Sequence, residues 1–486
     1  MVNQYQSFNQ SFINGEWTEG NEARTADMVN PYDNKVLANV HLASLDQLND
    51  AFTGASKAQK AWGQDPEQRK AVIRKAVKYF KDHQAEIQEI LTLESGSTAV
   101  KASLEFDLTV GVMEESLTMV DQVGKFEDKQ SIIPDKMNEF YRLPKGVIAS
   151  IAPFNFPLYL SMRTIAPALA LGNAVVHKPD LKCGLISGSV IARAFEEAGL
   201  PSGVFQSLLT KSSVTGDRMF NHDEANFVSF TGSTPVGRQI GQVAGEQLKD
   251  VALELGGNGP FCVLSDADID QAVDAAIFGK YMHQGQICMM INRLIVHEDV
   301  YDKFVEKFVE RSKNIKYGDP RDPDVVVGPL IDDNQMEKSL ANISKAKEAG
   351  FDILLEGEQD GRVLTPTVIG NVDNDSELAQ TEMFSPIALI IKADSDDDVI
   401  AKANDTAFGL SSAIFSRDEE KARKYALELQ YGMTHINDQP VNDEPTALFG
   451  GMRQSGIGRF GSPFIIDEFT EGKWISVQNE PREYPF

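Results

Sequence analysis

Alternating apolar runs and helical patterns between residues 146 and 230 constrain the fold more than any other feature of this sequence. Four short apolar runs occur, at residues 147–152, 174–176, 204–209 and 227–230, and helical patterns at residues 157–171 and 185–198 lie between them. Runs that are mostly apolar, without strict alternation, predict strands buried on both faces, and such strands joined by helices form a parallel sheet. We therefore expect a doubly wound α/β domain, an architecture that suits nucleotide binding.

The flanking segments predict further α/β structure. Asn14-Gly15 between apolar residues predicts a tight hairpin, and helical patterns follow at residues 44–61 and 65–95. Beyond Leu253 a helix is predicted from one apolar face, made of Ile269, Ala272, Val273, Ala276 and Ile277, with strands at residues 294–296 and 387–391. Because 486 residues exceed what one hydrophobic core usually holds, a second α/β domain is expected.

The C-terminal residues 474–477 alternate apolar and polar side chains, which predicts one more strand. This strand is far along the chain from the predicted sheets. We therefore expect a solitary strand that pairs across a subunit boundary.

Charge and cysteine content exclude several classes of protein. A formal net charge of -26 repels phosphate backbones and anionic lipid surfaces, so neither nucleic acid nor a membrane is an expected partner. The three cysteines show no close pair or metal-binding spacing, which predicts no metal site and no disulfide framework. The start of the chain, Met1-Val2-Asn3-Gln4, lacks the pattern of a secretory signal, and no run of about 18 apolar residues occurs. We expect a cytoplasmic protein.

The segment FTGSTPVG, residues 230–237, combines a strand end, a glycine turn and a helix start. Free backbone N–H groups and the helix dipole at such a junction attract an anion. The pattern predicts a pyrophosphate site, with a plain strand-to-helix turn as the alternative.

Cys288 lies in a polar loop, QGQIC, between a predicted helix and a strand. A single cysteine is often only a small buried hydrophobe, but Gly285 and Gln286 are not typical of a core. Backbone donors in such a loop can stabilise a thiolate, which is the nucleophilic form. The other cysteines, Cys183 and Cys262, lie in apolar or helical surroundings and are assigned to packing.

Two polar residues stand at strand ends. Glu254 in LELGGNGP interrupts an apolar strand just before two glycines, so it is either a surface ion-pair partner or a partly buried general base. Asn155 in PFNFP lies between two aromatic residues, where a turn cap is the simpler interpretation.

Seven segments, in this order and spacing, resemble the aldehyde dehydrogenase superfamily over nearly the whole chain. They are PFNFP (153–157), His177-Lys178-Pro179, FTGSTPVG (230–237), LELGG (253–257), GQIC (285–288), EMFSP (382–386) and FGGMRQSGIGRFG (449–461). The resemblance implies an α/β fold with three parts: a doubly wound Rossmann-type dinucleotide-binding domain (1–122 and 145–253), a second α/β catalytic domain (254–460) and a small oligomerisation arm (123–144 and 461–486). A homodimer or homotetramer is implied as well.

Carried over residue by residue, the resemblance implies that Cys288 is the nucleophile, Glu254 the general base and Asn155 the side-chain donor of the oxyanion hole. The implied cofactor is NAD or NADP. Its expected contacts are Lys178 at the adenosine ribose, Gly232, Ser233 and Gly237 around the diphosphate, and Glu382 and Phe384 at the nicotinamide ribose. The implied reaction oxidises an aldehyde to a carboxylic acid through a thioester on Cys288.

One position departs from the family pattern. Many NAD-preferring members carry a glutamate three residues after the ribose-binding lysine, whereas Leu181 stands here and Lys182 follows. Without that anion a 2′-phosphate is not repelled, so we expect NADP to be accepted, alongside NAD.

The segments PFNFPLYLSMRT, GQICMMINR and PREYPF resemble most the benzaldehyde and vanillin dehydrogenase branch, which implies an aromatic aldehyde. Tyr159, Arg163, Met289 and Phe449 then lie at the substrate passage. Aromatic and methionine side chains suit an aryl ring, and Arg163 can pair with a phenolate or a carboxylate; equally, all four can serve packing. An aliphatic semialdehyde of amino-acid catabolism is the alternative substrate.

Other classes of protein remain as alternatives. A CoA-acylating relative would not need the water-activating Glu254, and a binding protein that only keeps the fold would not need the cysteine, glutamate and asparagine together. A thiol hydrolase that ignores nicotinamide is the third alternative.

Overall fold

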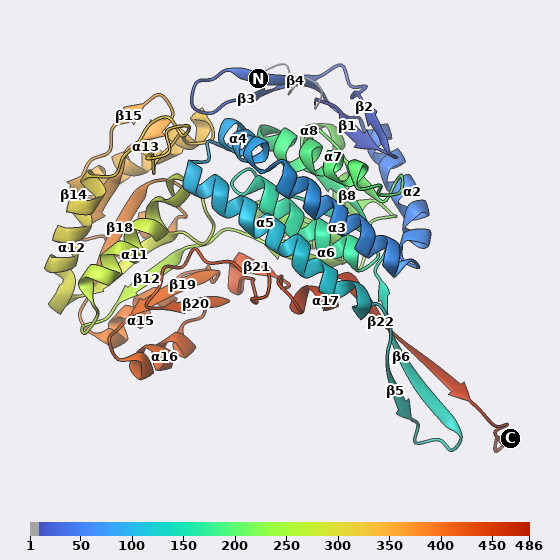
Figure 1. Cartoon of the computed structure of the whole chain (residues 1–486). Helices are drawn as coiled ribbons and strands as arrows, with labels where there is room; N and C mark the ends of the chain where they lie inside the picture. Colours follow the sequence, from blue (N-terminus) through green and yellow to red (C-terminus); the bar gives the residue numbers. More distant parts are fainter. Residues whose placement is uncertain (1–8) are drawn as a thin grey trace.

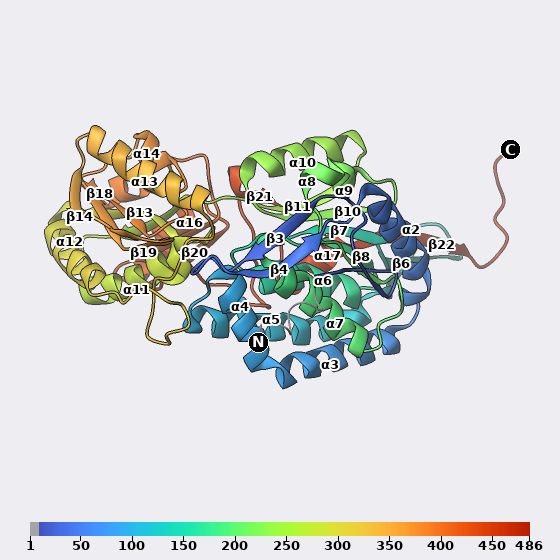
Figure 2. The same cartoon turned by 90° about the horizontal axis from the view of Figure 1, so that it is seen from above.

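The structure, a computed structural model, describes residues 9–486 and contains two α/β lobes and a projecting three-stranded arm (Figure 1, Figure 2). The segment Met1 to Gln4, for which no secretory signal is predicted, lies outside the described residues. Within residues 9–486 no helix is both long and apolar enough to cross a membrane.

The first lobe is built on an eight-stranded sheet with the order β2-β1-β9-β8-β7-β10-β11-β21. Its strands are β1 (Ser11–Ile13), β2 (Glu16–Thr18), β7 (Val147–Ile151), β8 (Ala174–Lys178), β9 (Phe205–Ser207), β10 (Phe227–Thr231), β11 (Asp250–Glu254) and β21 (Gly456–Ile457). The strands from β9 to β11 are parallel. The four apolar runs of the sequence are β7 to β10, as predicted, and the Asn14-Gly15 hairpin joins β1 to β2.

Helices cover both faces of this sheet, so the predicted doubly wound arrangement is confirmed. On one face Phe52 of α2 (Leu45–Trp62) and Ile240 of α10 (Thr234–Glu246) share a core with Val176 of β8. On the other face α6 (Pro157–Ala170) and α7 (Val190–Glu197) bury apolar residues against the sheet. Helices α3 (Pro66–Asp82), α4 (Gln84–Ser95) and α5 (Ala99–Met119) form an outer layer.

The predicted helix over residues 65–95 is in fact two helices, because His83 breaks it. The His83 backbone leaves the helical region at φ -113° and ψ 19°. Its ring stacks on Tyr79 at 4.1 Å between centroids, and its Nδ1 lies 2.8 Å from the Tyr79 carbonyl oxygen. The helical periodicity of the sequence continues across this break, which explains why the pattern alone did not reveal it.

The second lobe is built on a seven-stranded sheet with the order β14-β17-β18-β13-β12-β19-β20, in which only β14 is antiparallel. Its strands are β12 (Gly259–Val263), β13 (Ile291–His297), β14 (Asp352–Leu355), β17 (Thr367–Gly370), β18 (Ile387–Ala393), β19 (Ser411–Phe415) and β20 (Met433–Ile436). Its helices are α11 (Ile269–Tyr281), α12 (Glu298–Lys313), α13 (Asp333–Glu348), α15 (Asp396–Asn404) and α16 (Glu419–Glu428). The predicted apolar face of α11 packs in the core of this lobe.

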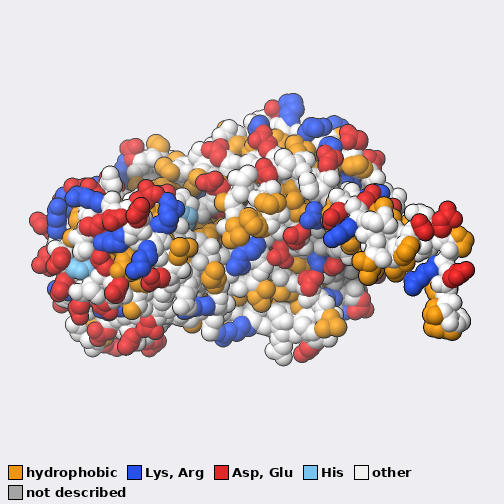
Figure 3. All heavy atoms as spheres, turned by 90° about the horizontal axis from the view of Figure 1, so that it is seen from below, with side chains coloured by type: hydrophobic (Ala, Val, Ile, Leu, Met, Phe, Trp, Pro, Cys, Tyr) orange, Lys and Arg blue, Asp and Glu red, His pale blue; other side chains and the backbone are white. Residues whose placement is uncertain are grey.

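The arm is a sheet with the order β22-β6-β5, made of β5 (Gly124–Gln130), β6 (Lys136–Pro144) and β22 (Thr470–Gln478). The predicted C-terminal strand lies in β22, but it is not solitary. It pairs with β6 of its own chain along its whole length, because the hairpin β5-β6 projects beside it. Apolar side chains remain on the arm surface (Figure 3), among them Trp474, which is 62% exposed.

Smaller elements complete the chain: β3 (Thr25–Val29), β4 (Val36–His41), β15 (Gln359–Asp360), β16 (Val363–Leu364), α8 (Ser212–Thr215), α9 (Arg218–Asn221), α14 (Glu377–Gln380), α17 (Phe464–Phe469) and several short turns of 3₁₀ or π helix. The strand β21 lies inside the range 254–460 but pairs with β11 of the first sheet. The division of the chain into three domains remains a prediction.

The carboxyl ends of strands in the first sheet face the amino ends of strands in the second sheet. In the first sheet the chain order reverses between the neighbours β7 and β10, and ligands bind outside the carboxyl ends of strands at such a point. The candidate residues follow this geometry: Asn155 comes after β7, Ser233 after β10 and Glu254 at the end of β11, while Cys288 precedes β13 and Glu382 precedes β18. The carboxyl edge of the first sheet therefore meets the amino edge of the second.

Candidate active site

Cys288 lies on a tightly held loop between α11 and β13. The loop begins with η5 (Met282–Gly285), where His283, Gln284 and Gly285 all have positive φ angles, of 48°, 58° and 74°. A side chain at Gly285 would clash with the backbone of Ser385, so only glycine fits there. The Gln284 amide donates to the Pro329 carbonyl oxygen at 2.8 Å, which connects the turn to a neighbouring segment. This backbone brings Cys288 to the boundary between the lobes.

Asn155 is bonded directly to the same loop. Its Nδ2 donates to the Gln286 carbonyl oxygen at 2.9 Å, and the side chain is buried. An amide nitrogen carries two N–H groups, so a second donor remains for another acceptor. The helix α6 that follows Asn155 is capped by Glu105, which accepts from the backbone N–H groups of Leu158 at 2.8 Å and Tyr159 at 3.2 Å. The donor side chain and the cysteine are therefore held in a fixed relation.

Glu254 ends β11 with a carboxylate that is only 1% exposed. Neither of its oxygens makes a regular hydrogen bond with any residue in the range 9–486. Burial raises the pKa of Glu254 to about 8, against the opposing effects of Arg163 and Arg459. A carboxylate with a raised pKa and open acceptor positions is suited to take a proton from water or a thiol.

Cys288 differs from the other two cysteines in its access. Cys183 and Cys262 are fully buried, as expected for packing, whereas Cys288 is partly exposed and lines two cavities. Burial, with the nearby carboxylates of Glu254 and Glu382, raises the pKa of the Cys288 thiol to about 12. The thiol is therefore protonated at neutral pH, and its reaction as a nucleophile requires a base.

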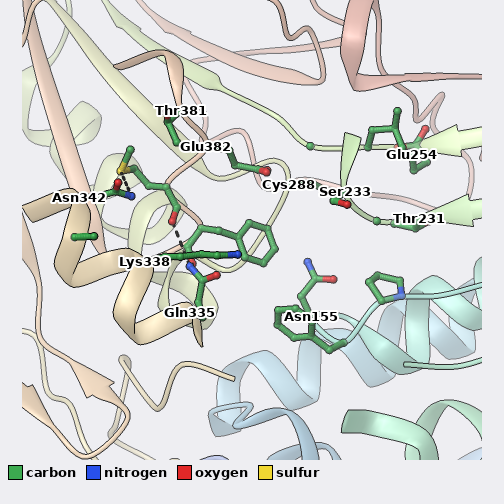
Figure 4. Close-up of a pocket in the computed structure, with 18 of the residues that line it drawn as sticks. Asn155, Thr231, Ser233, Glu254, Cys288, Gln335, Lys338, Asn342, Thr381 and Glu382 are labelled. Carbon is green, nitrogen blue, oxygen red and sulfur yellow. Dashed lines mark hydrogen bonds between the residues drawn. The ribbon is translucent and has the colours of Figure 1, made fainter. Parts of the chain in front are cut away.

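The larger cavity has a volume of about 470 Å³ and lies between the lobes. Figure 4 shows Asn155, Ser233 and Glu254 on one side of it and the α13 residues on the other. Its lining includes Pro153, Phe154, Asn155, Thr231, Gly232, Ser233, Glu254, Leu255, Gly256, Cys288, Gln335, Lys338, Asn342, Lys345, Thr381, Glu382, Met383 and Phe384. Four predicted cofactor contacts, Gly232, Ser233, Glu382 and Phe384, are thus brought together in one cavity with Cys288.

The features of this cavity fit a dinucleotide. Helix α10 begins at Ser233, whose side chain does not cap it, so the first-turn N–H groups remain available to an anion such as a diphosphate. At the opposite end, the Glu382 carboxylate accepts from the Gly257 N–H at 2.9 Å and has a further oxygen to accept from a ribose hydroxyl. Phe384 has a positive φ of 49° and packs edge-on against Phe154 at 6.0 Å between centroids.

Two predicted cofactor contacts do not line this cavity. Lys178, at the end of β8, is half-buried, and burial lowers the pKa of its ammonium group. Gly237 is buried in α10, where a side chain would clash with Leu255 of the strand end beneath it. The structure therefore gives Gly237 a packing reason to be glycine, which is independent of a diphosphate contact.

Cys288 also lines a second, narrow pocket of about 30 Å³. Its lining is mainly apolar: Leu104, Leu108, Asn155, Phe156, Tyr159, Leu160, Ile287, Cys288, Met289, Val441, Asp443 and Phe449. Three of the predicted substrate residues, Tyr159, Met289 and Phe449, line it. Arg163 does not, because its guanidinium is buried behind the wall and forms an ion pair with Asp443, with Nη1 3.2 Å from Oδ2.

Reasoning from the sequence missed several lining residues. Gln335 donates to the Phe384 carbonyl oxygen at 3.0 Å, and Lys338, Asn342 and Lys345 lie on the same face of α13. Their spacing of three and four residues is a recognisable helical stripe, but it is identical to that of any solvated helix face. Asp443 lies in a loop whose sequence has no periodic pattern. Its role becomes visible only through its buried ion pair with Arg163. Within residues 9–486 no cluster of His, Cys, Asp and Glu is arranged to hold a metal ion.

Comparison with known proteins identifies relatives over the whole site. A family model described as "Aldehyde dehydrogenase family" matches residues 17–475. Vanillin dehydrogenase of Corynebacterium glutamicum is 45% identical over 470 residues, which cover 96% of this chain and 97% of that protein. Benzaldehyde dehydrogenase YfmT of Bacillus subtilis is 40% identical over 485 residues, 99% of this chain and 100% of that protein. A structure of betaine aldehyde dehydrogenase from Staphylococcus aureus in complex with NAD+ matches with a TM-score of 0.95 at 32% identity, covering 98% of this chain and 96% of that one.

Proposed function

The chain belongs to the aldehyde dehydrogenase family and is therefore an NAD(P)-dependent aldehyde dehydrogenase, and we propose that its substrate is an aromatic aldehyde, which it oxidises to the carboxylic acid through a thioester on Cys288. The observation that carries the proposal is the meeting of two cavities. The wide cavity, which holds glycines and polar groups from both lobes, and the narrow, mainly apolar pocket share Cys288 and Asn155 in their linings. A sulfur atom between them can attack an aldehyde on one side while a hydride acceptor is bound on the other.

In the proposed first step, Cys288 loses its thiol proton and the sulfur forms a bond to the aldehyde carbon. That proton leaves to solvent, so Glu254 stays deprotonated for the second step. The carbonyl oxygen becomes an oxyanion, which the free N–H of Asn155 and the backbone N–H of Cys288 stabilise. When bound, NAD(P) accepts a hydride. Loss of that hydride from the carbon, with re-formation of the carbonyl, leaves a thioester on Cys288.

In the proposed second step, Glu254 takes a proton from water, and the resulting hydroxide attacks the thioester carbon. The bond between the carbon and sulfur breaks, the acid leaves and Cys288 recovers its proton. The burial of Glu254 supports this role, because a solvated or ion-paired carboxylate would be a weaker base. The same feature argues against a CoA-acylating enzyme, in which a thiol rather than water would receive the acyl group.

The aromatic substrate is supported by the walls of the narrow pocket. Phe156, Tyr159, Phe449 and Met289 surround the space in front of Cys288 and offer flat or polarisable surfaces to an aryl ring. The names of the relatives, vanillin and benzaldehyde dehydrogenases, agree with this choice. An aliphatic semialdehyde remains the alternative substrate.

The remaining proposals concern the cofactor and the assembly. We propose that Leu181, which stands where many NAD-preferring relatives carry a glutamate, allows NADP as well as NAD. The exposed Trp474 and the other apolar side chains of the arm support a homo-oligomer that pairs through this surface. The roles assigned to individual residues, including Lys178 and Gly237 at the cofactor, are proposals of the same standing.

An absorbance assay at the reduced-nicotinamide band tests the proposed function. Benzaldehyde, vanillin and a set of aliphatic semialdehydes are each combined with NAD or NADP, with and without CoA. We expect reduction of both cofactors with the aromatic aldehydes, without stimulation by CoA. Turnover confined to semialdehydes would contradict the aromatic assignment, and a strict requirement for CoA would contradict hydrolysis by Glu254.

A further inference from the structure

A carboxylate stands in the wall of the mainly apolar substrate pocket. Asp443 lines the pocket in the company of Leu104, Leu108, Leu160, Val441 and Phe449, and its side chain is only 5% exposed. A carboxylate in such surroundings is costly unless donors surround it. Its presence therefore needs a structural explanation or a functional one.

The structure supplies three donors to Asp443. Arg163 Nη1 lies 3.2 Å from Oδ2, the Tyr159 hydroxyl donates to the carboxylate, and so does the backbone N–H of Glu444. Burial raises the pKa of Asp443 to about 6 even though all three partners oppose this effect. The carboxylate is thus ionised at neutral pH. A carboxylate has about four acceptor positions, so one remains for a further donor.

The ion pair also decides what Arg163 can do. Its guanidinium lies over the Phe449 and Phe460 rings, 4.2 Å and 4.4 Å from their centroids, and its charge is directed to Asp443. Arg163 is absent from the pocket lining, whereas Asp443 is part of it. A ligand in the pocket therefore meets a carboxylate instead of a guanidinium. This placement disfavours the pairing of Arg163 with a substrate carboxylate or phenolate that the sequence left open.

We propose that Asp443 is a specificity-determining residue that accepts a hydrogen bond from a ring hydroxyl of a neutral hydroxyaryl aldehyde and disfavours aldehydes that carry a carboxylate. The inference rests on the proposed function and refines its substrate class. A hydroxyl group matches the open acceptor, and a hydrogen bond to a charged group is among the stronger ones. An anionic substituent would face Asp443 in a pocket of low dielectric constant, which is repulsive.

Matched aldehydes test this proposal on the wild-type enzyme. At neutral pH, kcat/KM is measured for benzaldehyde, for 3- and 4-hydroxybenzaldehyde, for the corresponding methoxy compounds and for the corresponding carboxy compounds. The methoxy compounds keep an oxygen on the ring but lack the donor. We expect the hydroxy compound to exceed its methoxy partner by about tenfold at one ring position or the other, and the carboxy compounds to fall at least about tenfold below benzaldehyde.

The variant Asp443→Asn then separates recognition from packing. The amide keeps the shape but removes the charge, so the penalty on carboxy compounds should shrink by about tenfold and the preference for hydroxyl over methoxy should fall to within about threefold. Asp107→Asn makes the same change at an exposed position of the helix that carries Leu104 and Leu108, so it serves as the control and should leave both ratios unchanged. A structural role alone would lower kcat/KM for all the aldehydes by one factor.

The outcomes separate the role of Asp443 from the proposed function. If Asp443→Asn fails to fold, the wild-type ratios still count: no hydroxyl preference at either ring position, or no discrimination against carboxy compounds, would overturn the inference. Benzaldehyde oxidation with unselective ratios would leave the proposed function intact and reject only the role of Asp443. Absence of turnover with every aromatic aldehyde would reject both together.

Discussion

The two cavities that meet at Cys288 are built from different materials. The larger one is lined by glycines, a helix start and polar side chains from both lobes, including Ser233, Glu382 and Gln335. The smaller one is lined mainly by apolar side chains, together with Asn155, Cys288 and the carboxylate of Asp443. Backbone groups and strand ends follow from the fold, whereas apolar walls depend on individual side chains. The fold therefore dictates how the chain receives a cofactor, while a few side chains decide which aldehyde it receives.

Among residues 9–486, only Asn155 and Cys288 line both cavities. Substitutions should therefore fall into three groups. Changes at the shared residues affect every substrate and cofactor, changes at the large cavity alter the cofactor ratio, and changes at the narrow pocket alter the aldehyde ratio. A variant of the large cavity that alters the aldehyde ratio, or a variant of the narrow pocket that alters the cofactor ratio, would contradict this division.

The largest effect is expected from Cys288→Ala. Without the sulfur no thiohemiacetal or thioester forms, so aldehyde oxidation should fall to background with either cofactor. The reduced-nicotinamide absorbance measures the loss. Cys262→Ala is the matched control, because Cys262 is fully buried in a core, and it should retain activity if it folds. Appreciable oxidation by Cys288→Ala would place the nucleophile elsewhere.

Asn155→Ala should have the next largest effect. Removal of one oxyanion donor typically lowers kcat by about 10²–10³. Because Asn155 also holds the Gln286 carbonyl, Asn155→Asp serves as a comparison that keeps the size but replaces the amide donor. Both variants should be impaired for aromatic and aliphatic aldehydes alike. A loss confined to one class of aldehyde would show that Asn155 acts through the narrow pocket instead.

The pH dependence of kcat should show a smaller and graded effect. Glu254 acts as a base only when deprotonated, and its pKa is raised to about 8 by burial. The rate should therefore rise as the pH rises toward about 8 and level off above it, with a fall of about tenfold per pH unit well below that value. A steady-state profile with one saturating aromatic aldehyde measures this. A flat profile between about pH 6 and pH 9 would contradict the proposed base.

Leu181→Glu should have the smallest effect and should alter only the cofactor ratio. A carboxylate at this position would repel a 2′-phosphate, so kcat/KM for NADP should fall by about tenfold or more while that for NAD changes little. Leu181→Gln controls for size and polarity without charge. In the wild type, Lys182 is paired with Asp332 at 2.9 Å, so tolerance of NADP does not depend on that lysine. A wild-type NAD preference above roughly a thousandfold, about 4 kcal/mol, would overturn the expectation.

The fold followed from the sequence where local pattern and tertiary role coincide. The apolar runs of β7, β8 and β10 could only be buried strands, and the Asn14-Gly15 turn has one common use. The break at His83 escaped because a helical period continues through it. The tail strand was recognised as a strand, but the expectation that it is solitary was wrong, since no local pattern reports that β6 projects alongside it.

The site was predictable where a residue type stands out from its neighbours. Cys288, Glu254 and Asn155 each interrupt an apolar or glycine-rich segment, and the structure brings them to one place. Arg163 was placed at the substrate passage through the family resemblance, but its partner Asp443 is 280 residues away and no spacing connects them. The buried ion pair between Arg163 and Asp443 joins residues far apart in the sequence, so it forms only in the folded chain. This pair sets the charge in the wall of the narrow pocket.

The thioester on Cys288 and its hydrolysis with Glu254 as the base are tested most directly with Glu254→Gln, NAD and benzaldehyde in rapid mixing. With the proposed base removed, acylation should continue while hydrolysis slows. We expect a burst of about one reduced nicotinamide per active site, and mass spectrometry should find one benzoyl group on the peptide that contains Cys288. An unimpaired steady-state rate, or an acyl group on any other residue, would contradict the account.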